Sequence, residues 1–194
     1  MKFLIYLVTI ILLIGPSVNA RDLRAVRIEK FLQRYEPNSP LLEYTDEIVE
    51  CADKFDLDYR LYVAISGAES GFGRAYPKSK HNLTGILNGA TGFNNIFHNI
   101  YYTHKLIGTR HWYKKYRKTK KIEDLVYVYK CVPPFDHYIY NMRFALDGIS
   151  RVVIDEEKAA KAKRKEKPEQ KLIFWNQAEY DKYKNHSKNT LIVR

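Results

Sequence analysis

Cysteine is scarce in this chain of 194 residues, which contains only Cys51 and Cys131. Two cysteines are too few for a disulfide-rich scaffold, and the sequence leaves open whether they form one bridge or remain two separate thiols. No group of histidines and cysteines has the spacing of a metal site, so we expect neither a metal ion nor a cofactor.

Long hydrophobic runs are equally rare, and the one that stands out covers residues 3–14. Lys2 precedes this run and the small-residue sequence VNA follows it at 18–20, a pattern typical of a cleavable export signal. The run is short for a membrane span, although an uncleaved N-terminal anchor remains an alternative. We therefore expect residues 1–20 to be a signal peptide and the protein to be secreted or periplasmic and associated with the cell wall.

Acidic side chains are outnumbered by basic ones, 22 to 33, so the formal net charge is +11. A basic exported protein suits an anionic partner such as a cell wall, and charge of this sign also attracts nucleic acid without specificity. The run KKYRKTKK at 114–121 predicts a solvated basic patch. Because nothing in the chain resembles a nucleic-acid-binding module, we expect an anionic cell-wall surface as partner, no specific nucleic acid, and a monomer.

The remaining sequence predicts a mainly α fold for one domain over residues 21–154. Residues 71–92 are rich in glycine and asparagine, which predicts a loop or short-hairpin lobe beside a cleft. Residues 155–194 form a basic linker and tail, in which 172–183 has the aromatic content of a short docking helix. Apolar residues recur at helical spacing in 23–35, 40–55, the stretch from Asp56 or Asp58 to Glu69, 94–107, 111–116, 122–130 and 135–153.

The most informative segment is AISGAESGFG at 64–73, which contains one carboxylate, Glu69. Leu61, Ile65 and Glu69 are spaced four residues apart, so the carboxylate continues an otherwise apolar helical stripe. A carboxyl group held partly out of water has a raised pKa, and a protonated carboxylic acid is the general acid of glycosidic-bond cleavage. Glycines at 71 and 73 allow the backbone to leave the helix and a bulky polymer to approach. The pattern predicts a glycan-cleaving enzyme.

Several motifs in order extend this interpretation: AES-GFG at 68–73, HNLTGI at 81–86, a phenylalanine at 93 opening a helix, and YVYK at 127–130 before a proline break. Between Pro40 and Ile149 the chain resembles the bacterial autolysin-type endo-β-N-acetylglucosaminidases, whose domain is also described as mannosyl-glycoprotein endo-β-N-acetylglucosaminidase-like. These enzymes belong to the lysozyme and lytic transglycosylase superfamily. The resemblance implies a lysozyme-like helical fold and a hydrolase that cleaves the glycan strands of peptidoglycan.

The resemblance also implies roles for particular residues. Glu69 matches the catalytic acid, and Tyr129 matches a tyrosine close to it, with Tyr127 as second choice and otherwise a substrate contact. Thr84 stands where the family commonly has an aromatic residue, and the G-L-M-Q stretch of lytic transglycosylases is absent, which favours a glucosaminidase. The expected substrate-binding residues within the matching motifs are Ser70, Asn82, Gly85, Ile86 and Phe93.

A second acid is missing from the neighbourhood, because no Asp or Glu occurs between Ser70 and Ile122. One route is that the 2-acetamido group of the substrate attacks its own anomeric carbon, and this is the route we favour. Attack by the sugar's 6-hydroxyl would instead give an anhydro product, as in a transglycosylase. A protein carboxylate would have to come from Glu123, Asp124, Asp136, Asp46 or Glu47.

Two further hypotheses therefore remain beside the glucosaminidase. A lytic transglycosylase or a muramidase would use the same Glu69 on the same polymer. A protein without catalytic activity would use the cleft and the basic surface only to bind the cell wall.

Overall fold

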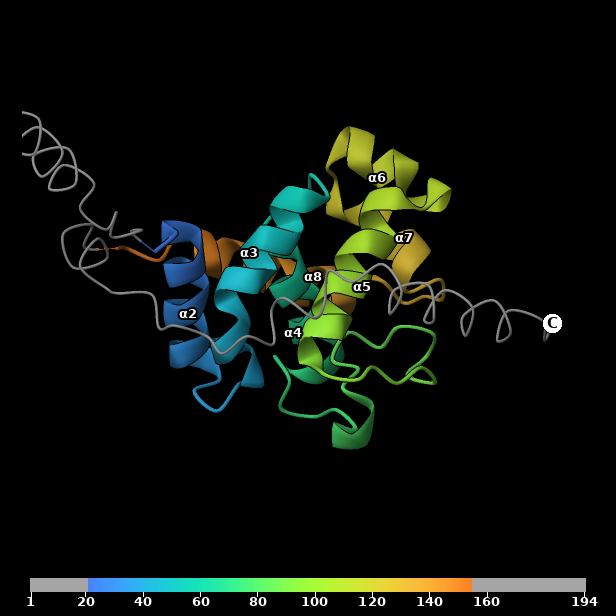
Figure 1. The fold of residues 1–194 in the computed structure, drawn as a ribbon. Coiled ribbons are helices and arrows are strands. Elements are labelled where there is room, and N and C mark those ends of the chain that lie inside the picture. The colour runs from blue at the N-terminus through green and yellow to red at the C-terminus, as the bar shows by residue number, and fades with distance from the viewer. Residues whose placement is uncertain (1–20, 155–194) are drawn as a thin grey trace, which may run out of the picture. The chain divides into compact units, whose positions relative to one another are not determined.

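The computed structural model describes residues 21–154, and within this range the fold is built from helices without any β-strand (Figure 1). The prediction of a mainly α fold is therefore confirmed. The expected signal peptide at 1–20 and the expected tail at 155–194 lie outside the described residues. The α-helices are α2 (Leu23–Tyr35), α3 (Thr45–Lys54), α4 (Leu61–Ser70), α5 (Ile96–Thr109), α6 (Lys114–Thr119), α7 (Ile122–Tyr129) and α8 (Asp136–Ser150).

Local signals explain where these helices begin. Asp22 caps α2 by accepting a hydrogen bond from the backbone N–H of Arg24 at 2.7 Å. Ser39 caps the 3₁₀ helix η1 (Pro40–Tyr44), which leads into α3. Asp58, one of the two residues at which the sequence predicts the start of the helix that carries Glu69, accepts a hydrogen bond from the N–H of Arg60 at 2.9 Å, just ahead of α4.

Among the helices of residues 21–154, α4 has the most buried N-terminal half, and it packs against α8 and α5. Its first six residues, Leu61 to Ser66, are all buried, so the helix is enclosed on every side and not along one stripe only. A helix that is apolar all around is stable only inside a core. Exposure returns only in the last turn, where Glu69 lies.

The segment between α4 and α5 contains turns and the short 3₁₀ helix η2 (Lys78–Lys80), so within the described residues this lobe is a loop and not a hairpin. A buried polar network ties the lobe to the core. Asn99 of α5 accepts hydrogen bonds at its Oδ1 from the hydroxyl of Tyr62 (2.8 Å) and the N–H of Leu83 (3.2 Å). Its Nδ2 donates to Thr84 Oγ1 at 2.9 Å. The single amide of Asn99 thus joins α4, α5 and the lobe.

No disulfide joins the two cysteines, whose pairing the sequence leaves open. Cys51 is buried in α3, whereas Cys131 is exposed after α7 and its thiol donates to the carbonyl of Val128 at 2.8 Å. In the range 21–154 no helix is long and apolar enough to cross a bilayer. The same range holds no cluster of three or more potential metal ligands.

His104 of α5 should make the stability of the fold depend on pH. Its ring is buried against Tyr62, with centroids 5.6 Å apart, and burial lowers its pKa to about 4 even though its Nδ1 bonds the carbonyl of Ile100. Because the unfolded chain takes up this proton at a higher pH than the folded chain, the free energy of unfolding should fall between pH 6.5 and 4. The expected loss is about 3 kcal/mol.

Urea unfolding at pH 4, 5 and 6.5, followed by circular dichroism, measures this slope. His104→Gln should flatten the curve, while part of the slope persists because burial also lowers the pKa of His98 to about 4. An identical slope in the wild type and in His104→Gln would show that His104 is not the group responsible.

Candidate active site

Glu69 lies in the last turn of α4, and the backbone reverses directly after it. Gly71 ends the helix at φ +58°, a left-handed conformation that glycine adopts at little cost, and its N–H bonds the carbonyl of Gly67 at 3.2 Å. The hydroxyl of Ser70 donates to the Ser66 carbonyl and accepts from the Gly73 N–H, both at 3.0 Å. Ser70, expected to bind substrate, is therefore buried and engaged within the turn that presents Glu69.

The lobe brings its backbone directly against the Glu69 carboxyl group at Gly85. Gly85 has φ +63°, and a Cβ atom at this position would lie only 2.5 Å from Glu69 Oε2. A side chain at this position would require the Glu69 carboxyl group or the lobe to move. The backbone at Gly85, one of the expected substrate-binding residues, thus brings the lobe against Glu69.

Asn82 stabilises the part of the lobe around Gly85 through hydrogen bonds within the lobe. Its side chain is buried, accepts from the N–H of Ile86 at 3.1 Å and donates to the carbonyls of Ile86 (2.9 Å) and Thr91 (3.0 Å). Ile86 and Phe93 are buried as well. These three side chains lie inside the lobe, and the lobe approaches Glu69 through its backbone at Gly85.

Tyr138 of α8 donates a hydrogen bond from its hydroxyl to Glu69 Oε1 at 2.8 Å. Burial, with the nearby Glu69 carboxylate as the next cause, holds the pKa of the Tyr138 phenol far above its ordinary value. The phenol therefore stays protonated and is a permanent donor to Glu69. Lys130 lies beside this pair, with its Nζ 5.6 Å from the centre of the Tyr138 ring.

The Glu69 side chain reaches solvent, yet its carboxyl group has a raised pKa. Partial desolvation is the main cause, and the Tyr138 hydrogen bond and the Lys130 charge partly oppose it by favouring the ionised form. A carboxyl group that is accessible, desolvated and held by a neutral donor can give a proton to a ligand and recover it afterwards. This is the behaviour that a general acid needs.

Tyr129 also belongs to this group, although its hydroxyl points to the lobe. It donates to the Thr84 carbonyl at 2.6 Å. Burial, together with the Glu69 charge, raises the pKa of Tyr129 despite that hydrogen bond. Tyr127 is exposed, and its ring packs edge-on against Phe135 with centroids 4.9 Å apart. The structure thus brings Tyr129 close to Glu69 and leaves Tyr127 on the surface of α7.

The sequence did not point to Tyr138 or Lys130 as partners of Glu69. Tyr138 falls on the apolar face of α8 with Met142, Ala145 and Ile149, all of them buried, a position typical of core packing. The available signal was its hydroxyl, because a tyrosine buried on an aliphatic face usually finds a hydrogen-bond partner.

Three of the candidate second carboxylates form ion pairs with other residues. Glu123 pairs with Arg143, Asp124 with Lys115 at 2.6 Å, and Asp46 with Arg21 at 3.4 Å. Asp136 is exposed in the first turn of α8, and Glu47 is buried in α3. The groups that act on the pKa of Glu69 are Tyr138 and Lys130, and neither is a carboxylate.

Comparison with known proteins finds no counterpart for this chain: no family model matches it, and no curated protein or solved structure does so either. The chemistry of the site therefore has to be argued from its own residues. Those residues form one compact group, made of Glu69, its donor Tyr138, the Lys130 charge, the Gly85 backbone and Tyr129.

Proposed function

We propose that the protein is an exported peptidoglycan hydrolase of lysozyme-like fold, which cleaves β-1,4 glycosidic bonds in the manner of an N-acetylglucosaminidase. The observation that supports it most is the solvent-accessible Glu69, with its raised pKa, at the end of a buried helix and against the lobe backbone. The motifs around 64–73, 81–86 and 127–130 and the export signal at 1–20 support the same assignment.

In the proposed mechanism, protonated Glu69 donates its proton to the glycosidic oxygen as the bond to the leaving sugar breaks. The 2-acetamido oxygen of the N-acetylglucosamine unit attacks the anomeric carbon and closes a cyclic intermediate, so no protein nucleophile is required. Glu69, now ionised, is stabilised by Tyr138 and Lys130. It then takes a proton from the water that opens the intermediate, which restores the acid and leaves a reducing end.

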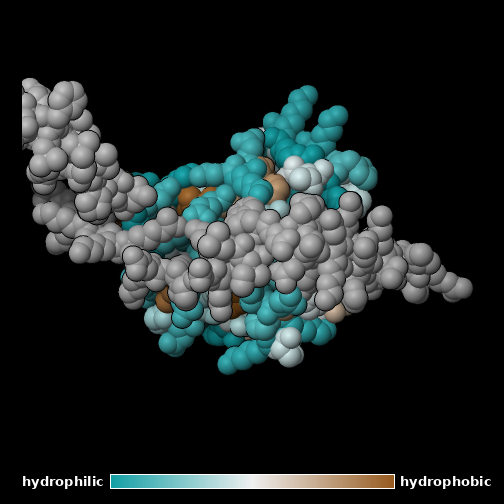
Figure 2. All heavy atoms as spheres, in the orientation of Figure 1, coloured by the Kyte–Doolittle hydropathy of each residue, from teal (hydrophilic) through white to brown (hydrophobic). Residues whose placement is uncertain are grey.

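A basic surface supports an anionic polymer as substrate. Hydrophilic side chains gather over α6 in Figure 2, where Lys114, Lys115 and Lys118 are exposed. Such a surface raises the local concentration of the enzyme on a negatively charged wall and loses this effect at high salt.

Digestion of purified peptidoglycan, with mass spectrometry of the products, tests the assignment. The expected products carry N-acetylglucosamine at the reducing end. Reducing muramic acid would identify a muramidase, and an anhydromuramic end would identify a lytic transglycosylase. Binding to cell walls without any cleavage would contradict the hydrolase assignment and support a wall-binding protein.

Tyr138→Phe should shift the pH profile of the reaction upward. The variant loses the hydrogen bond that favours ionised Glu69, so the pKa of Glu69 rises further and the proton donor persists to higher pH. We also expect a loss in kcat of about tenfold, because the carboxyl group is positioned less well. Initial lysis rates between pH 4 and 9 give both quantities.

The matched control is Tyr59→Phe, which removes one hydroxyl just before the opposite end of α4. Tyr59 lies beside the guanidinium groups of Arg24 and Arg60. The pH profile of lysis by Tyr59→Phe should coincide with that of the wild type. If Tyr138→Phe also leaves the alkaline limb in place, Tyr138 does not act on ionised Glu69 during turnover.

A further inference from the structure

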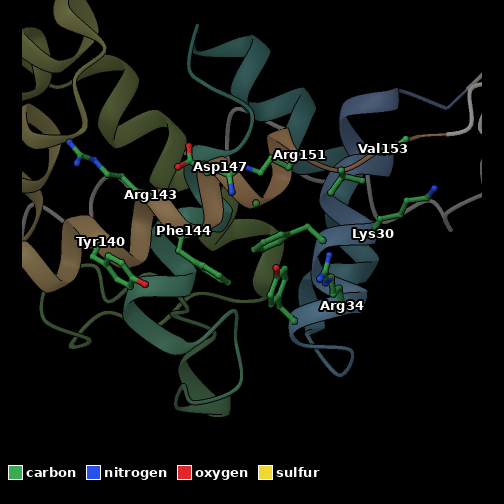
Figure 3. Close-up of a pocket in the computed structure, with 12 residues that line it drawn as sticks. Lys30, Arg34, Tyr140, Arg143, Phe144, Asp147, Arg151 and Val153 are labelled. Carbon is green, nitrogen blue, oxygen red and sulfur yellow. The ribbon is translucent and has the colours of Figure 1, made fainter.

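A groove of about 880 Å³ lies between α2 and the C-terminal half of α8, away from the side chains that surround Glu69 (Figure 3). Its base is aromatic: the Phe31 and Tyr35 rings lie 4.8 Å apart, and the Tyr35 and Phe144 rings 5.0 Å apart in an edge-on arrangement. Gly148 permits this packing, because a Cβ atom there would collide with the Phe31 ring. Tyr35 and Phe144 remain substantially exposed, as does Tyr140 at one end of the groove.

The border of the groove is positively charged. Lys30 and Arg34 line it from α2, and Arg143 and Arg151 from the α8 side, against one acidic residue, Asp147. Arg143 already pairs with Glu123. Within residues 21–154, Lys30, Arg34 and Arg151 form no ion pair, and the Arg34 guanidinium lies over the Tyr35 ring, 5.4 Å from its centre. The three cations are therefore available to an anionic ligand, and Tyr140 and Phe144 provide the rings for stacking.

The groove and the candidate active site use opposite faces of α8. Tyr138 and Met142 lie on the buried face, which packs toward α4 and Glu69. Tyr140 and Phe144 fall on the other side of the helix, since successive residues are rotated by about 100°, and Arg151 follows directly after the last helical residue. A ligand in the groove therefore meets a set of side chains that does not include Glu69 or Tyr138.

We propose that this groove binds a short stretch of an anionic glycan strand as a second, non-catalytic site. Exposed aromatic rings offer flat apolar faces on which sugar rings stack, and guanidinium groups bind carboxylates through paired hydrogen bonds. The volume falls within the range of sites for small ligands, about 300–1,000 Å³. Twelve residues line the groove, whereas a stable protein partner covers about 20–30 residues on each side. The size thus favours an oligosaccharide over a protein.

This proposal rests on the proposed function only for the identity of the polymer, namely peptidoglycan, whose sugars carry carboxylates on their peptides. Binding in the groove would keep the enzyme on the glycan strand while the active site at Glu69 cleaves successive glycosidic bonds. Its effect should therefore be large on the insoluble wall and absent on short soluble substrates.

Titration calorimetry on the full chain carrying Glu69→Gln, with soluble tetrasaccharide muropeptides as the probe, measures binding without turnover. Since this variant keeps the cleft, the groove's share of the binding is the part that substitutions in the groove remove. Adding Arg34→Gln and Arg151→Gln should weaken binding at least tenfold, and adding Tyr140→Ala alone about fivefold. The control pair Lys54→Gln and Arg110→Gln removes the same charge from α3 and from the end of α5, at exposed positions outside both the groove and the basic surface of α6, and should change Kd less than twofold. Thermal melting verifies that each variant is folded.

Three results would overturn the inference. Equal weakening by both charge-removing pairs would indicate non-specific attraction, and equal affinity for an uncharged N-acetylglucosamine tetramer would exclude carboxylate recognition. Equal affinity for a polyglutamate peptide would indicate an acidic protein partner.

The two proposals also fail separately, because lysis by an otherwise wild-type chain reports on Glu69 alone when the substrate is short and soluble. On that substrate the double variant Arg34→Gln, Arg151→Gln should retain full activity. On intact walls its rate of lysis should fall severalfold. A wild-type chain that never lyses walls but still binds muropeptides through the groove would remove the proposed function and leave this inference standing.

Discussion

Glu69→Gln should lower the rate of cell-wall lysis by about a thousandfold or more. Glutamine keeps the shape of the side chain and accepts the Tyr138 hydrogen bond, but it has no proton to donate to the leaving sugar. A positioned general acid contributes roughly 10²- to 10⁴-fold to such reactions, and here the same group is also the base for the second step. Turbidity of a wall suspension and a zymogram measure the loss.

The same variant should not weaken the fold. The raised pKa of Glu69 means that its ionised form is less favourable in the folded chain than in the unfolded one, so this group destabilises the fold at pH values above its ordinary pKa. Gln removes that charge, and the melting temperature at pH 7 should stay constant or rise. A melting temperature that falls would show that the charge itself holds the site together.

Glu50→Gln is the matched control, since Glu50 is an exposed carboxylate on α3 and the change is chemically identical. It should leave lysis unchanged. Undiminished lysis by Glu69→Gln would reject Glu69 as the acid, and with it the mechanism derived above.

Gly85→Ala should abolish most of the activity by displacing the Glu69 carboxyl group. The added Cβ atom would lie 2.5 Å from Oε2 and 3.0 Å from Cδ, so either the side chain or the lobe must move. We expect kcat to fall about a hundredfold or more, because a shift near 1 Å at the reacting group is costly. The positive φ adds a loss of about 1 kcal/mol in the free energy of unfolding.

Gly89→Ala separates these two effects. Gly89 has φ +71°, but a Cβ atom there would have no heavy atom within 4 Å. In urea unfolding, Gly89→Ala should lose about as much free energy of unfolding as Gly85→Ala, but it should retain its activity. Equal activity in both variants would show that the lobe adapts and that the close approach at Gly85 is not needed.

The helices could be predicted from sequence because their signals are local. Ser39 and Pro40 mark a helix start, the one through its hydroxyl and the other through its ring, and the structure places them at the start of η1. Glu69 could be singled out because a carboxylate on an apolar stripe is a pattern visible within nine residues.

The partners of Glu69 could not be predicted in the same way. Tyr138 is 69 residues further along the chain, and its contact depends on how α8 packs against α4. The burial of Asn82 inside the lobe likewise depends on hydrogen bonds within the folded loop. No periodic pattern in the sequence corresponds to these bonds. Such pairings are decided by tertiary packing and not by propensity.

The buried amide of Asn99 has one more consequence. Its bonds to Tyr62, Leu83 and Thr84, together with the bond from Tyr129 to the Thr84 carbonyl, fasten the lobe to three core helices at one point. Releasing the lobe would leave several buried polar groups without partners, which costs about 1–3 kcal/mol each. The lobe therefore shares the cooperativity of the core, and the enclosure around Glu69 is kept for as long as the domain stays folded.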